Sequence, residues 1–230
     1  MLGDLISWFG DGANWRGSGG IPAQLLAHVE FTLISLLIAA AIAIPLGLFV
    51  GHSGRGGVLL VGASNAIRSL PTLGLVTFLF LLISGAEAAA IIGLVVLAIP
   101  PILAGTYAGV SEADRVVVDA AVGMGMTGRQ RLWQVEVPVA LPLIMGGIRN
   151  AVLQLVATVA VAAYVGLDGL GRFLLDGLKI LDYSAVAGGA LLTALLAVLL
   201  DLVFALLSRI VVPQGLRVAA RGAAAGGTHP

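Results

Sequence analysis

The stretch Asp119-Ala-Ala-Val-Gly-Met-Gly-Met-Thr-Gly-Arg-Gln-Arg-Leu-Trp-Gln-Val-Glu-Val-Pro138 decides how the rest of the chain is read. It lies in the only long polar insertion, residues 111–141, which separates two apolar segments. Gly123 and Gly125 interrupt the insertion, because glycine adopts backbone conformations that other residues avoid. The pattern predicts two short helices joined by a glycine turn.

Capping residues mark the start of each short helix. Ser111 is followed three positions later by Asp114, and Thr127 is followed by Gln130, and both pairs match a capping box. Pro138 predicts that the second helix ends just before it. Two capped helices form a rigid element, and rigidity is what a contact that transmits force needs.

The composition places the chain in a lipid bilayer. Its 230 residues are 59% hydrophobic and only 10% charged, and the mean hydropathy is +1.08. A water-soluble domain of this length needs a larger polar surface. The formal net charge of zero does not indicate a nucleic-acid partner, and the lack of cysteine excludes disulfides and thiolate chemistry. The sequence therefore predicts an all-α membrane protein.

Five apolar segments are long enough to cross a hydrocarbon core of about 30 Å, which takes roughly 20 residues. They are Phe31–Val50, Val58–Ile83, Ala88–Ala108, Leu143–Val165 and Ala185–Leu207. Since the number of spans is odd, the two termini are expected on opposite sides of the membrane. Trp8 and Trp15, before the first span, are expected to anchor at the headgroup level, which tryptophan favours.

The placement of basic residues predicts the orientation. Arg16, Arg172 and Lys179 lie on the side of the N-terminus, whereas the other side carries Arg55, Arg115, Arg129, Arg131, Arg209, Arg217 and Arg221. The positive-inside rule makes the second side cytoplasmic, so the N-terminus is outside and the C-terminus is inside. The expected organisation is an extracytoplasmic segment 1–24, a transmembrane domain 25–216 with the cytoplasmic loop 111–141, and a disordered cytoplasmic tail 217–230.

Polar residues inside the spans are candidates for a translocation path. The second span must begin before Arg68, because the apolar run after Pro71 is too short to cross alone. Arg68 and Asn65 would then lie within the membrane beside a proline bend, as expected next to an aqueous path. The alternative is an arginine that reaches the cytoplasmic interface along a tilted helix.

A second polar group follows one face of the fourth span. Its members are Arg149, Asn150, Gln154 and Thr158. This stripe is expected to face a path or a partner helix, and hydrogen bonding between helices without a transport role is the alternative. The prolines Pro100 and Pro101 predict a kink in the third span, and Gly146 and Gly147 predict close helix approach in the fourth.

The cytoplasmic loop resembles the coupling loop of ABC importer permeases, whose pattern is E-A-A-x3-G-x9-I-x-L-P. Asp119, Ala120, Ala121, Gly125 and Pro138 match it in spacing, with Asp in place of Glu and Val in place of Ile and Leu. The resemblance implies a type I importer fold like that of methionine permeases. It also implies that this loop docks on a separate ATPase.

The resemblance covers residues 25–216 and is greatest to permeases for glycine betaine, choline, carnitine and proline. The residues that carry it are Arg68–Thr72, Gly123–Thr127, Arg129–Arg131, Leu141-Pro142, Met145–Arg149 and Gly169–Gly171. The chain departs from these relatives at Leu103–Thr106 and at Leu167-Asp168. An importer permease for another small solute is therefore the alternative.

The partners follow from the resemblance. They are an ATPase dimer that binds ATP and magnesium, a second permease subunit, an extracytoplasmic substrate-binding protein and the lipid of the bacterial cytoplasmic membrane. This chain itself has no phosphate-binding loop, so it is expected to bind no cofactor and to catalyse no reaction. His28, His52 and His229 have no carboxylate or cysteine partners at ligand spacing and are expected to be surface residues.

Two other functions compete with an ATP-driven permease. A self-powered secondary transporter typically shows inverted repeats, and this chain shows no internal duplication. A membrane scaffold without a path is disfavoured by the polar residues inside the spans.

Overall fold

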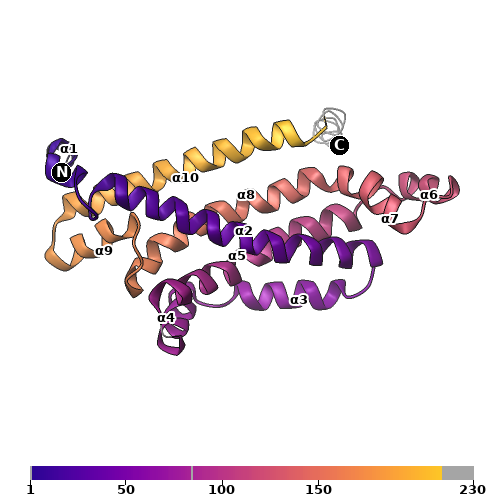
Figure 1. Ribbon diagram of the computed structural model, residues 1–230, viewed down its shortest axis with the longest axis horizontal. Coiled ribbons are helices and arrows are strands. Elements are labelled where there is room, and N and C mark those ends of the chain that lie inside the picture. Colours follow the sequence, from indigo (N-terminus) through magenta and orange to yellow (C-terminus); the bar gives the residue numbers. More distant parts are fainter. Residues whose placement is uncertain (1, 84, 214–230) are drawn as a thin grey trace, which may run out of the picture. The chain divides into compact units, whose positions relative to one another are not determined.

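A computed structural model describes residues 2–83 and 85–213 of the chain. All regular elements among these residues are helices, as predicted (Figure 1). The tail 217–230, with Arg217, Arg221 and His229, lies outside the described residues. The described helices fall into two compact units, one formed by residues 2–39, 66–83, 85–98 and 151–201, and the other by residues 40–65, 99–150 and 202–213.

Four long helices match four of the five predicted spans. They are α2 (Ile21–Ser53), α5 (Ala86–Ser111), the helix Gly128–Val165 that includes α8 (Val137–Ala162), and α10 (Tyr183–Val211). Each begins before or ends beyond its predicted span, because the helices continue past the apolar core into polar ends. At 1.5 Å per residue, even the 26 residues of α5 exceed the thickness of a bilayer core.

The predicted second span is two helices rather than one. α3 (Gly57–Arg68) and α4 (Thr72–Leu82) are bent by 86° at the break between them. Pro71 precedes α4 with an extended backbone, and its missing N–H and fixed φ explain why the helix stops there. The bend was expected at this proline, and the pair counts as a fifth span only if the two helices are taken together.

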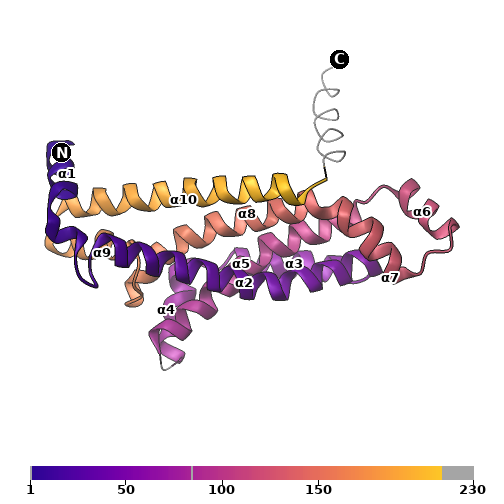
Figure 2. The ribbon, with the colours of Figure 1, turned by 45° about the horizontal axis from the view of Figure 1, so that its top comes forward.

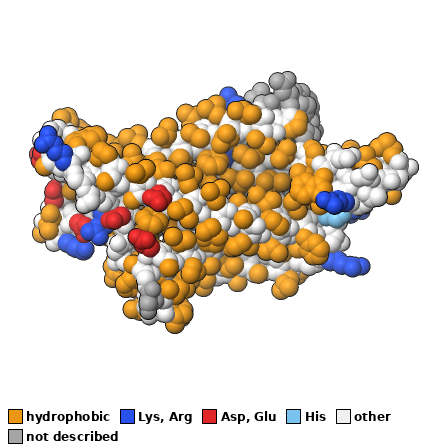
Figure 3. Space-filling view, in the orientation of Figure 1, with side chains coloured by type: hydrophobic (Ala, Val, Ile, Leu, Met, Phe, Trp, Pro, Cys, Tyr) orange, Lys and Arg blue, Asp and Glu red, His pale blue; other side chains and the backbone are white. Residues whose placement is uncertain are grey.

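Hydrophobic side chains cover most of the visible surface (Figure 3). The large apolar side chains of α10 are widely exposed, including Leu195, Val198, Leu199, Leu202 and Ile210. In the most apolar 18-residue stretch of α10, only 6% of the residues are buried. A helix that is apolar and uncovered in this way suits contact with lipid or with another membrane subunit.

In the second of the two units, parts of α2, α5 and α8 form the hydrophobic core. Leu48, Val110, Ala140 and Ile144 are its buried members. Small residues bring these helices together: a Cβ added at Gly109 would lie 2.8 Å from the Cβ of Ala140. Of the two glycines predicted to allow close approach, only Gly147 lies against a neighbouring helix, whereas a Cβ at Gly146 would meet no atom within 4 Å.

The other unit packs the N-terminal segment against α9 (Gly171–Ile180) and α10, with α1 (Leu2–Gly10) beside the start of α10 in Figures 1 and 2. Trp8 of α1 is buried, edge-to-face with Phe173 at a centroid distance of 5.4 Å. The expectation that Trp8 anchors at the membrane surface is therefore wrong, because its ring fills a space over Gly188. Trp15 is 48% exposed and its indole donates to the carbonyl of Phe9.

Candidate functional site

The first short helix of the loop, α6 (Arg115–Gly123), begins at Asp114. The Oδ1 atom of Asp114 accepts a hydrogen bond from the N–H of Val116 at 2.9 Å. The predicted capping box at Ser111 is wrong, because α5 continues to Ser111 and the Ser111 hydroxyl donates to the carbonyl of Ala108. Asp114 caps the helix alone, as an aspartate commonly does.

The glycine turn after α6 is a Schellman motif. Gly125 has a φ of +78°, a left-handed conformation that suits glycine. Its N–H donates to the carbonyl of Val122 at 2.9 Å, and the N–H of Met126 donates to Ala121 at 3.2 Å. These bonds satisfy carbonyls that a helix end otherwise leaves without partners. The turn is thus fixed by backbone bonds.

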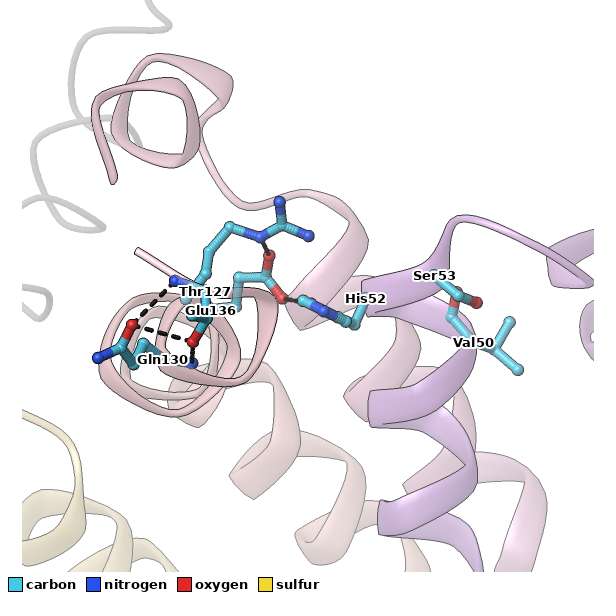
Figure 4. A network of polar contacts seen from close by, with 7 residues as sticks. Val50, His52, Ser53, Thr127, Gln130 and Glu136 are labelled. Atoms are coloured by element: carbon cyan, nitrogen blue, oxygen red, sulfur yellow. Dashed lines mark hydrogen bonds and ion pairs between the residues drawn. The ribbon is translucent and has the colours of Figure 1, made fainter. Parts of the chain in front are cut away.

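The capping box predicted for the second short helix, α7 (Gly128–Arg131), is confirmed. Figure 4 shows the Thr127 hydroxyl and the Gln130 side chain turned toward each other across the helix start. The N–H of Thr127 donates to Gln130 Oε1 at 2.9 Å, and the N–H of Gln130 donates to the Thr127 hydroxyl at 3.4 Å. The start of α7 is therefore held by reciprocal bonds.

The helix does not end at Pro138, contrary to the prediction. A π-helical turn, η2 (Leu132–Glu136), follows α7 and leads directly into α8. The N–H of Val137 donates to the carbonyl of Leu132, five residues earlier. The wider π turn directly before Pro138 accommodates the proline, which has no N–H to donate. The loop is consequently joined to its span without a break.

A buried carboxylate lies in the π turn. Glu136 is 4% exposed. Its Oε2 atom is 2.6 Å from His52 Nδ1, at the end of α2, and its Oε1 atom accepts from Arg131 Nε at 2.8 Å (Figure 4). The expectation that His52 is an unpartnered surface residue is wrong, since its partner lies 84 positions away in the sequence.

The outer surface of α6 combines large apolar side chains with two exposed charged residues, Arg115 and Asp119. Val116 is 74% and Met124 is 72% exposed. Asp119 and Ala120 are exposed beside them, whereas Ala121 is buried and Pro138 half-buried. α6 also contacts α7 and η2. Exposed alanine and valine next to a carboxylate form a surface that another protein can approach closely.

The residues predicted for a path lie on α3 and α8. Asn65 and Arg68 are exposed at the end of α3. Arg149 is half-buried in α8 and Asn150 is exposed. The Gln154 amide donates to the carbonyl of Leu97 in α5 at 3.0 Å, which is a hydrogen bond between helices.

A second polar centre, which the sequence did not predict, joins α2 to the segment before α9. His28 is fully buried, so the prediction of a surface residue is wrong for it as well. Its Nε2 atom is 3.0 Å from the carbonyl oxygen of Val156, and its Nδ1 atom accepts from the N–H of Leu170 at 3.2 Å. The proton therefore resides on Nε2.

Gln24, one turn before His28, holds the same segment. Its Oε1 atom accepts from the N–H of Gly169 at 2.6 Å, and its Nε2 atom donates to the carbonyl of Ser18 at 3.0 Å. Gly169 has a φ of +138°. Helical spacing of Gln24 and His28 was the available signal, since residues four apart share one face. In the part of the chain that the structure describes, no cluster of histidine and acidic side chains could hold a metal ion.

Known proteins resemble this chain over most of its length. The family model for the binding-protein-dependent transport system inner membrane component matches residues 43–214. The glycine betaine/carnitine/choline transport system permease protein OpuCB of Bacillus subtilis is 32% identical over 190 residues, which are 83% of this chain and 88% of that protein. The osmoprotectant import permease protein OsmW of Salmonella typhimurium is 31% identical over 205 residues, which are 87% and 95% of the two chains.

Solved structures share the fold. A chain of the MetNI methionine ABC transporter in an inward-facing conformation matches with a TM-score of 0.73 and 22% identity, over 83% of this chain and 95% of that chain. A chain of an amino acid ABC transporter with histidines matches with a TM-score of 0.66 and 18% identity, over 90% and 96%. The predicted methionine-permease-like fold is confirmed.

Proposed function

The chain belongs to the family of binding-protein-dependent transport system inner membrane components, and on this premise we propose that it carries a small osmoprotectant such as glycine betaine, choline, carnitine or proline. It is a multi-pass permease subunit of an ATP-driven importer in the inner membrane, and a separate subunit hydrolyses ATP. The family also implies a substrate-binding protein as partner. A self-powered transporter is thereby excluded.

The substrate class is supported by the relatives, whose names give choline, carnitine or glycine betaine as their solutes. Recognition of a quaternary ammonium usually takes a cage of aromatic faces. Aromatic residues make up only 6% of this chain, and Trp8 and Phe173 face each other in the N-terminal packing. We therefore assign primary recognition to the binding protein and passage to the permease.

The coupling role belongs in this proposal to the loop 111–141, with Asp119, Ala120, Ala121, Gly125 and Pro138 as its motif. The observation that carries it is the rigid pair α6–α7, fixed by a Schellman turn and a capping box and continuous with α8. An ATPase dimer that binds Mg·ATP would press on the exposed face of α6. Because no flexible linker separates α7 from α8, the movement passes into the span.

The path is proposed to form between two permease subunits, either two copies of this chain or this chain and a paralogue. The four or five spans of one chain are too few to enclose a wide path. The exposed apolar side chains of α10 can contact a second subunit. Asn65, Arg68, Arg149 and Gln154 are the candidate path residues. The N-terminal segment 1–24 would face outside and the tail 217–230 the cytoplasm.

The test is reconstitution in liposomes of the chain with an ATPase and a binding protein encoded beside it. We expect uptake of radiolabelled glycine betaine, choline or carnitine that needs ATP inside the vesicle and the binding protein outside. Uptake of methionine or another solute, with none of these amines transported, would contradict the substrate proposal. Uptake driven by an ion gradient without ATP would contradict the coupling proposal.

A further inference from the structure

We propose that His52 and Arg131 are positioning residues for Glu136, and that the three form a polar clamp fixing the α7–η2 segment to the last turn of α2. The inference rests on the proposed coupling role of the loop. Its consequence is that a displacement received at α6 and α7 reaches α2 as well as α8.

Both oxygens of the Glu136 carboxylate have a partner in the clamp. Each Glu136 oxygen has its own partner, with His52 Nδ1 at 2.6 Å from Oε2 and Arg131 Nε at 2.8 Å from Oε1. Both distances are in the short range of charge-assisted hydrogen bonds. Because a carboxylate only accepts, the proton of this contact lies on His52 Nδ1.

Burial makes the clamp more than a surface ion pair. The Glu136 side chain is 5% exposed, and those of His52 and Arg131 are 24% and 25% exposed. A buried carboxylate left without one partner is strongly unfavourable, whereas an exposed pair contributes little. Separation of α2 from the π turn is therefore opposed by the cost of stranding the Glu136 charge.

A contact of the His52 ring adds to the two ion pairs. The His52 ring also lies against the start of α7, since a Cβ on Gly128 would be 3.4 Å from its Nε2 atom. The π turn sets the direction of Glu136, because the wider turn changes which side of the helix each residue faces. The π turn, the His52 ring and the ion pairs of Glu136 therefore all stabilise the contact between the end of α2 and the α7–η2 segment.

Spin labels test the clamp without reference to the substrate. The chain has no cysteine, so Phe49→Cys on α2 and Gln134→Cys in the π turn, both exposed, give one labelled pair. Electron paramagnetic resonance in the complex with the ATPase, with labelled chain diluted in unlabelled chain, should give a narrow distance between the two labels of one chain that is the same with and without Mg·ATP. In His52→Leu and Glu136→Gln backgrounds, the distribution should broaden or shift with nucleotide.

The matched controls are His52→Asn, whose amide can replace the Nδ1 donor, and Arg55→Gln, which removes a nearby exposed charge. Both should keep the narrow distance. A nucleotide-dependent distance in the unsubstituted background, or a His52→Leu distribution equal to the unsubstituted one, would overturn the proposal.

Transport provides a second readout. The substrate carried per ATP hydrolysed should fall by at least about tenfold in His52→Leu, as expected for loss of a hydrogen bond to a charged group, and should recover in His52→Asn. A ratio that stays constant while both activities fall would show a merely structural role and overturn the clamp. Failure of the proposed function is distinct, since the unsubstituted complex would then carry no osmoprotectant while the label distance still reports the clamp.

Discussion

Gly105 of α5 and Gly147 of α8 lie backbone against backbone: a Cβ added at Gly147 would stand 3.3 Å from the Cα of Gly105 and 2.6 Å from the carbonyl oxygen of Pro101. Small residues allow this approach between membrane helices, where packing rather than water exclusion drives association. The adjacent Gly146 has no such neighbour.

We expect Gly147→Ala to destabilise the protein by about 1–3 kcal/mol, because the added methyl meets backbone atoms that cannot move independently. Gly146→Ala is the matched control and should be neutral or slightly stabilising, since alanine favours helix more than glycine does. Denaturant unfolding in detergent measures both. Equal effects of the two substitutions would contradict the packing.

Gly125→Pro should leave the protein inserted but uncouple ATP hydrolysis from transport. Proline cannot adopt the φ of +78° and has no N–H to donate to Val122, so the Schellman turn is lost. Gly123→Ala is the control, because Gly123 lacks a positive φ and an added Cβ meets nothing within 4 Å. The measurement is substrate transported per ATP hydrolysed. Coupled transport by Gly125→Pro at the normal ratio would remove the argument from rigidity.

Asp119→Lys should weaken association with the ATPase by at least about tenfold, because reversal of a charge in an interface places like or unpaired charges together. Glu112→Lys makes the same charge change at an exposed residue just after α5, outside the α6 face. Affinity of the purified permease for its ATPase measures the difference. The assignment of α6 as the docking helix fails if the two variants bind alike.

His28→Leu should lower the free energy of unfolding by about 1–3 kcal/mol, since the N–H of Leu170 loses its acceptor in a buried place. His28→Asn can keep an acceptor near the Nδ1 position and should lose less. Thermal unfolding in detergent ranks the variants. Equal stability of His28→Leu and the unsubstituted protein would show that the bond contributes nothing.

The orientation can be measured with single cysteines. Ser18→Cys and Glu112→Cys are both at exposed positions. A membrane-impermeant thiol reagent should label Ser18→Cys in intact cells and Glu112→Cys only after permeabilisation. The opposite result would invert the proposed topology.

Local features of the fold were predictable from the sequence, and distant contacts were not. The Thr127–Gln130 capping box and the bend at Pro71 depend on residues within a few positions, so spacing alone indicates them. His52 and Glu136 are 84 positions apart, and His28 and Val156 are 128 apart. No single sequence shows which turns of two helices meet, so both histidines were assigned to the surface.

Pro138 shows a different cause of error. The rule that proline ends a helix holds where the ring meets a regular α-helical turn before it. Here a π turn precedes the proline, and the helix continues into α8. The prediction at Ser111 failed for a related reason: α5 continues through Val110 to Ser111, so α6 begins later and Asp114 is its capping residue.

The π turn also explains why nine residues separate Gly125 from Val135. These nine residues contain the Thr127 cap, the single α-helical turn of α7 and most of the π turn. Glu136, the last residue of the π turn, then contacts His52. Removing or adding one residue here would rotate everything beyond it by about 100° around the helix axis. The nine-residue interval therefore sets the angle at which Glu136 faces His52.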